Sequence, residues 1–226
     1  MRSTLFVVLL CSSPVFARPV QPTPPRSSPP HAARGLPAPA PQPPAPALPK
    51  LTIADEDIPD ECADLATLAD SPSKNQALSA RISLAACLVD EKSRALVLCD
   101  CEQSVNEINA ILDPSLAVLD DVVAAGDPAM QVLARYTQGS ILAGFAQRML
   151  STVPPPVDAT EASLALRDTR VTMLAPLVQP WLMRAQGAFT QVDKLARENP
   201  KLGKNPAVVA AVRSSREKLS QGVANR

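Results

Sequence analysis

Residues 171–196, which read VTMLAPLVQPWLMRAQGAFTQVDKLA, decide the fold. Their apolar residues recur in alternating steps of three and four, which places them on one face of an α-helix as a heptad-like seam. Pro176 and Pro180 fall inside the seam, so the helix either divides in two or continues with a kink. The unbroken phase favours a kink. The seam is formed by Val171, Leu174, Val178, Leu182, Ala185, Phe189, Val192 and Ala196.

Helical periodicity also covers the chain before this seam. One stripe is formed by Leu78, Ile82, Ala85 and Val89, and a longer one by Met130, Leu133, Thr137, Ile141, Phe145 and Met149. Strand signals are nearly absent, because no stretch of five or more residues alternates apolar and polar residues and no Asn-Gly or Asp-Gly turn occurs. We therefore expect an all-α fold, an irregular antiparallel bundle of about six or seven helices with an aliphatic core.

Capping residues predict where several helices begin and end. Gly126 is expected to form a left-handed C-cap. After the break at residues 154–156, which are all proline, Asp158 and Glu161 have the spacing of a capping box. Three further helix starts are predicted by an N-cap residue followed by proline, at Asp113-Pro114, Asp127-Pro128 and Asn205-Pro206.

The first 50 residues differ in composition from the rest of the chain. Residues 1–17 combine Arg2, a short apolar run and the ending Val-Phe-Ala, which is the pattern of a cleavable signal peptide. The apolar run is shorter than the roughly 20 residues that cross a bilayer, so we expect no transmembrane span. A lipid anchor at Cys11 is disfavoured, because leucine rather than a small residue precedes it. Residues 18–50 are proline-rich and predict a disordered, extended tether, which leaves residues 51–226 as the helical domain.

Removal of the signal peptide leaves four cysteines, Cys62, Cys87, Cys99 and Cys101. An even number in an exported chain predicts two disulfides. Four cysteines allow three pairings, and their spacing does not choose among them. If the helices on either side of residues 71–74 form a hairpin, Cys62 would meet Cys87, and Cys99 would then pair with Cys101.

Charge is divided unevenly between the tether and the domain. Residues 18–50 contain Arg18, Arg26, Arg34 and Lys50 but no acid. Without these four and Arg2, 17 of the 22 basic residues remain from Leu51 onward, against all 22 acidic residues, a net charge of about −5. A nucleic-acid partner is disfavoured, because phosphate binding needs a basic surface.

The sequence contains no recognisable catalytic or metal-binding set. The one histidine, His31, lies in the tether, so the domain cannot form a Ser-His-acid or Cys-His arrangement. The cysteine spacing does not match paired zinc knuckles, and we expect neither a metal nor another cofactor. Cys99 and Cys101 are close enough to act in thiol-disulfide exchange, although Asp100 between them would raise a thiol pKa.

These observations favour an exported, non-enzymatic helical protein, periplasmic or extracellular, that serves as a binding or scaffold protein. Its partner would be a protein or a cell-envelope component, held at a distance by the tether. Tyr136 and Trp181 are the candidate partner-contact residues, because large aromatic side chains dominate binding hot spots, although burial in the core is the competing expectation for both. Two alternatives are a thiol-disulfide exchange protein using Cys99 and Cys101, and a chaperone or inhibitor that shields an apolar client along residues 171–196.

Overall fold

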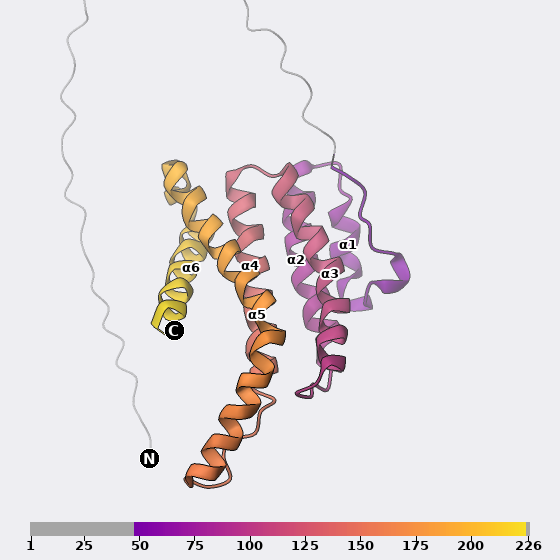
Figure 1. Cartoon of the computed structure of the whole chain (residues 1–226). Helices are drawn as coiled ribbons and strands as arrows, with labels where there is room; N and C mark the ends of the chain where they lie inside the picture. The colour runs from indigo at the N-terminus through magenta and orange to yellow at the C-terminus, as the bar shows by residue number, and fades with distance from the viewer. Residues whose placement is uncertain (1–47, 225–226) are drawn as a thin grey trace, which may run out of the picture. The chain divides into compact units, whose positions relative to one another are not determined.

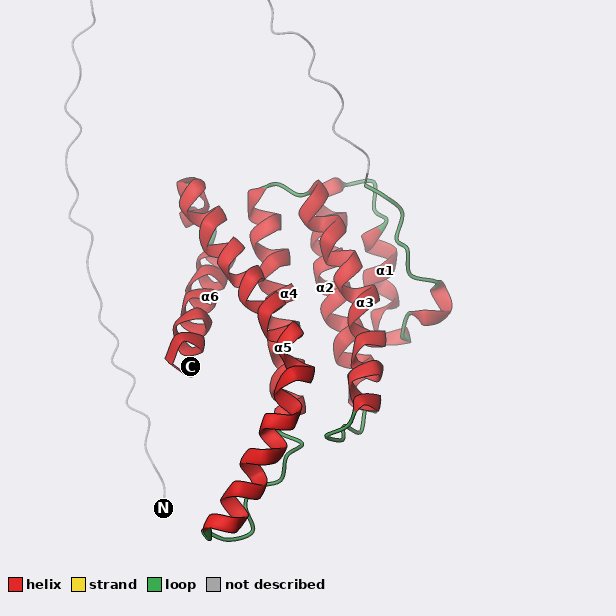
Figure 2. Ribbon diagram, in the orientation of Figure 1, coloured by secondary structure: helices red, strands yellow, loops and turns green. Residues whose placement is uncertain are grey.

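The computed structural model describes residues 48–224. The predicted signal peptide and nearly all of the predicted tether lie outside this range. Between residues 48 and 224 the chain forms six α-helices and no strand, which confirms the all-α prediction and the expected number of helices (Figures 1 and 2). The elements are η1 (Asp55–Asp57), η2 (Asp60–Cys62), α1 (Ala63–Ala69), α2 (Lys74–Arg94), α3 (Glu102–Ala125), α4 (Pro128–Leu150), α5 (Glu161–Glu198), η3 (Pro200–Lys204) and α6 (Pro206–Ala224).

Helix α4 lies at the centre of the bundle. It packs against α2 and α3 on one side and against α5 and α6 on the other, while α1 covers α2 at the edge (Figure 1). The main apolar core runs through α2, α3, α4 and α5 and contains Leu112, Phe145 and Trp181. A smaller cluster that includes Val192 and Val208 joins α4, α5 and α6. The six helices are therefore organised around α4.

Helix α5 is a single helix that includes both Pro176 and Pro180, so the seam does not divide. The seam faces the interior, with Leu174, Val178 and Phe189 among its buried residues. The first turns of α5 extend past the end of the bundle (Figure 2), and of residues 161–170 all except Ser163 are exposed. α5 thus has a packed part and a projecting part.

The predicted helix ends were right at two of the three Asx-Pro starts. The side chains of Asp127 and Asn205 accept backbone N–H groups at the beginning of α4 and α6. The start predicted at Asp113-Pro114 is wrong, because Pro114 lies inside α3. The packing of Ile108 and Leu112 in the core, in phase with buried Leu116 and Leu119, carries the helix through that proline.

Two other predicted caps are also wrong. Gly126 ends α3 in an extended conformation, with φ of −78° and ψ of 157°, rather than in the left-handed region. The N-cap of α5 is Thr160, whose hydroxyl accepts the N–H of Ser163. Asp158 instead accepts hydrogen bonds from Thr160, and the one from the Thr160 hydroxyl, followed by the one from its backbone N–H, holds the pKa of Asp158 below its ordinary value.

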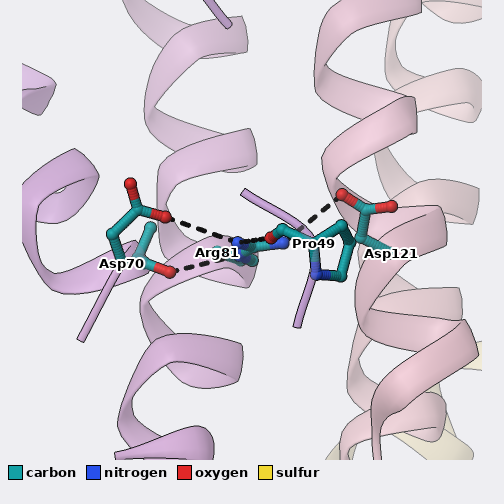
Figure 3. Close-up of polar contacts among 5 residues, drawn as sticks. Pro49, Asp70, Arg81 and Asp121 are labelled. Atoms are coloured by element: carbon teal, nitrogen blue, oxygen red, sulfur yellow. Dashed lines mark hydrogen bonds and ion pairs between the residues drawn. The ribbon is translucent and has the colours of Figure 1, made fainter. Parts of the chain in front are cut away.

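A buried arginine joins the beginning of the described chain to three helices. Arg81 of α2 is 1% exposed, and its guanidinium lies 3.3 Å from Asp121 of α3 and 3.5 Å from Asp70 after α1 (Figure 3). It also donates to the carbonyl oxygens of Ala69, at 3.2 Å, and Pro49. Leu48 packs against the core beside this cluster, so contacts of the helical domain begin before Leu51.

Helices α5 and α6 are joined by a charged contact. Arg216 donates to the carboxylate of Asp193 at 2.7 Å, and Arg197 pairs with the same carboxylate from one turn further along α5. The hydrogen bond from Arg216 lowers the pKa of Asp193 below its ordinary value of 3.8, although burial acts in the opposite direction. Asp193 is therefore a carboxylate that the folded protein stabilises in its charged form.

Candidate binding groove

A groove of about 720 Å³ lies where α4, α5 and α6 meet. Its volume is within the range of small-ligand and peptide pockets. Most of its surface is apolar and comes from all three helices. The lining residues are Ser140, Ala143, Gly144, Gln147, Leu150, Gln179, Leu182, Met183, Ala185, Gln186, Phe189, Lys218, Leu219, Gln221 and Gly222.

Two glycines in the lining of the groove have open space beside them. A Cβ atom placed on Gly144 of α4 or on Gly222 of α6 would meet no other atom within 4 Å. By contrast, a Cβ on Gly139 would come within 2.6 Å of the Phe189 ring, so one turn earlier α4 and α5 are in direct contact. The helices therefore pack closely at Gly139 and leave open space at Gly144.

The groove combines an apolar floor with a polar rim. Phe189 is buried at its base, and Leu182 and Met183 form part of one wall. Glutamines from all three helices contribute the amide groups, and among the described residues that line the groove Lys218 alone carries a charge. The Lys218 ammonium lies 6.0 Å from the centre of the Phe189 ring, within reach of a cation–π interaction. This arrangement suits an apolar ligand with hydrogen-bonding groups and a negative charge near Lys218.

An exposed, uncharged stripe runs along α5 and ends at Met183, which lines the groove. Leu166, Met173 and Met183 are 61%, 71% and 63% exposed. Together with Thr169, Pro176 and Pro180, which are also exposed, they follow one another in steps of three and four on the outward side of the helix. None of the six is charged. Large exposed apolar side chains that gather on one side of a helix are typical of protein interaction sites.

The two aromatic residues predicted as partner contacts do not contribute to this surface. Trp181 is 3% exposed, and its indole N–H donates to Asn109 at 3.0 Å, so the structure places it in the core. Burial in the core, the competing expectation for Trp181, is therefore what the structure shows. Tyr136 is half-buried and donates its hydroxyl hydrogen to Ser214 at 3.2 Å.

The seam of α5 also faces inward. Little of it is therefore exposed to bind the apolar client that the chaperone or inhibitor alternative requires. Of its eight residues only Leu182 is exposed, because α4 and α6 cover the rest. The parts of α5 that a partner can reach are the groove wall at Leu182 and Met183 and the uncharged stripe on the outward side of the helix. The spacing of the stripe is present in the sequence, but the seam dominates the pattern and hides this second stripe.

The four cysteines lie in two pairs at disulfide distance. Cys62 and Cys87 have Cα atoms 6.0 Å apart, and Cys99 and Cys101 have Cα atoms 5.2 Å apart. α1 and α2 form the hairpin that brings the first pair together. Neither pair lines the groove. Within residues 48–224, no three His, Cys, Asp or Glu side chains are grouped so that they could hold a metal ion.

The chain matches no protein-family model, and no curated protein or solved structure is similar to it at a significant level. Within residues 48–224, none of the helices has the length and apolar character needed to cross a bilayer.

Proposed function

We propose that this chain is an exported helical binding protein and that the groove between α4, α5 and α6 is where its partner binds. The carrying observation is the largely apolar groove itself, whose wall includes the exposed side chain of Met183, with Met173 and Leu166 exposed further along the same helix. Exposed apolar side chains are unfavourable in water, and a partner that covers them removes this free-energy cost.

The groove is proposed to bind its partner without converting it. None of its lining residues is a histidine, a cysteine or a carboxylate, and these are the side chains that most often perform acid–base or nucleophilic catalysis. The partner is a protein or a cell-envelope component that presents an apolar segment. Its segment would carry a carboxylate or another anion near Lys218.

Export is proposed from the signal-peptide pattern in residues 1–17 and from the two cysteine pairs at disulfide distance. The proline-rich residues 18–50 would then hold the helices away from the point of attachment or from the partner, by up to ~100 Å at about 3.1 Å per residue. N-terminal sequencing of the protein recovered outside the cytosol is expected to begin at Arg18. A chain that keeps Met1 and stays in the cytosol would contradict export.

The binding surface is tested by comparing two substitutions at exposed apolar positions. Met183→Asp places a charge in the groove, while Val209→Asp places one on the outer part of α6, away from it. Immobilised full-length wild type and the two variants are incubated with the envelope fraction, and retained proteins are identified by mass spectrometry. We expect wild type and Val209→Asp to retain the same set of proteins. Met183→Asp should bind these proteins at least about tenfold more weakly, which corresponds to about 1.4 kcal/mol of binding free energy.

Circular dichroism of both variants controls for folding, because each changed side chain is exposed and should leave the helices intact. If all three proteins retain the same set, the partner binds elsewhere. If none retains anything above background, the binding function itself is refuted.

A further inference from the structure

The two cysteine pairs differ in accessibility at one member: Cys62 is buried and Cys99 is exposed, whereas Cys87 and Cys101 are both half-buried. Cys62 has no exposed surface and lies in the cluster between α1 and α2. Cys99 is exposed, and Cys101 is half-buried immediately before α3. Cys99 is therefore the most accessible of the four cysteines and the one that a thiol in solution meets first.

The groups around the second pair favour a sulfur anion. Cys101 is the N-cap residue of α3, a 24-residue helix whose N-terminal dipole stabilises negative charge. Ser104, whose side chain is buried, accepts the backbone N–H of Cys99 at 2.8 Å. Its Oγ lies 3.2 Å from the sulfur of Cys99 and 3.9 Å from that of Cys101, so the hydroxyl can donate to either thiolate.

Asp100 would oppose a thiolate, but it has a counter-charge. The guanidinium of Arg170, on the projecting part of α5, lies 4.0 Å from the Asp100 carboxylate. This ion pair reduces the repulsion that a carboxylate between two cysteines exerts. The sequence alone could not show this contact, because residues 100 and 170 come from different helical regions.

We propose that the Cys99–Cys101 disulfide exchanges with thiols of a protein or peptide substrate. A substrate thiolate attacks the exposed sulfur of Cys99, and the bond to Cys101 breaks, so that Cys101 leaves as a thiolate stabilised by the N-terminus of α3 and by Ser104. The second thiolate of the same substrate then attacks the substrate sulfur that is bonded to Cys99, which forms the substrate disulfide and releases Cys99 as a thiolate. The substrate dithiol loses two electrons and two protons and becomes a disulfide, while Cys99 and Cys101 gain both and become thiols.

The neighbouring surface provides a contact for such a substrate. Val97, two residues before Cys99, is 87% exposed. An apolar side chain there can pack against a peptide whose cysteine approaches Cys99. The activity is separate from the groove, because none of these residues lines it.

The test compares the two pairs in one protein. Oxidised full-length protein is equilibrated in glutathione buffers of increasing reducing strength, the free thiols are alkylated, and each cysteine is quantified by mass spectrometry. The reducing strength is expressed as the squared concentration of reduced glutathione divided by the concentration of oxidised glutathione. We expect Cys99 and Cys101 to be half-reduced at a value of this ratio at least about 100-fold lower than the value at which Cys62 and Cys87 are half-reduced. Reduction of both pairs at the same ratio would overturn the proposal.

Single variants identify the attacked sulfur. By microscopic reversibility Cys99 is the residue that attacks a substrate disulfide, so Cys101→Ala is expected to accumulate a mixed disulfide with a model peptide that carries one intramolecular disulfide. Cys99→Ala is the matched control and should accumulate at least about tenfold less, because Cys101 is less accessible. Equal trapping by both variants, or trapping by neither, refutes the assignment. Neither outcome bears on binding at the groove.

Discussion

The guanidinium of Arg81 lies 3.3 Å from the carboxylate of Asp121, and this contact joins α2 to α3 next to Pro49, near the first described residues of the chain. The arginine is buried, whereas Asp121 and Asp70 are 29% and 55% exposed at their side chains. The carboxylates can thus be hydrated if the arginine is removed, but the carbonyl oxygens of Pro49 and Ala69 lose their donor.

We expect Arg81→Met to lower the free energy of unfolding by about 2–4 kcal/mol, because two carbonyl groups lose hydrogen bonds near the core and the ion pairs are lost. Urea denaturation followed by circular dichroism measures the change. Arg94→Met is the matched control, since Arg94 makes two ion pairs at the surface and should contribute less than about 1 kcal/mol. Equal effects of the two substitutions would contradict the structural role of Arg81.

Gly139→Ala is expected to lower the free energy of unfolding by about 1–3 kcal/mol, because the new methyl group would overlap the ring of Phe189. Gly187→Ala, on α5, meets no atom within 4 Å and should raise stability by about 0.5–1 kcal/mol through its higher helix propensity. Thermal and urea denaturation of both variants decide this. Adding Phe189→Leu to Gly139→Ala should recover part of the loss, and strictly additive effects would count against a direct contact.

The Cys62–Cys87 disulfide is expected to contribute more to stability than the Cys99–Cys101 disulfide. A bond with a sequence separation of 25 restricts the unfolded chain, so the double variant Cys62→Ala/Cys87→Ala should lose about 3.5 kcal/mol. The bond between Cys99 and Cys101 closes a far shorter loop, and removing both residues should cost less than about 2 kcal/mol. Denaturation in the absence of reductant gives both values. A larger loss at the second pair would reverse this assignment.

The contact between Asp193 and Arg216 predicts a stability that depends on pH. Because the pKa of Asp193 is lowered in the folded state, its contribution is complete above the ordinary value of 3.8 and is lost as the pH falls through the folded-state pKa. We therefore expect the difference in melting temperature between wild type and Asp193→Asn to be largest above about pH 5 and to shrink as the pH falls below 3.8. A difference that is constant from pH 7 to pH 2 would exclude this mechanism.

The helical fold could be predicted from the sequence because helical periodicity records which face of each helix is buried. The seam of α5 is the clearest case, since its buried residues keep their spacing through Pro176 and Pro180. Local signals were less informative. Asp113-Pro114 has the chemistry of a helix start, yet the burial of Ile108 and Leu112 before it outweighs that signal and extends α3 in both directions.

The groove could not be predicted, because it depends on a relationship among three helices. Gly144 and Gly222 are 78 positions apart and carry no shared local signal, yet both leave space beside α5. The exposure of Met173 and Met183 could have been predicted from the sequence, because both lie outside the seam. Trp181 shows the opposite limit: its size is equally compatible with a partner contact and with the core, and the structure decides for the core by its 3% exposure and its hydrogen bond to Asn109.

The position of Arg81 also has a mechanical consequence. A pulling force applied at Leu48 would pass through Pro49 into the guanidinium of Arg81 and be shared among α1, α2 and α3. The groove is built from α4, α5 and α6 alone. Load entering at this end would therefore reach α1, α2 and α3 first, and none of these helices lines the groove.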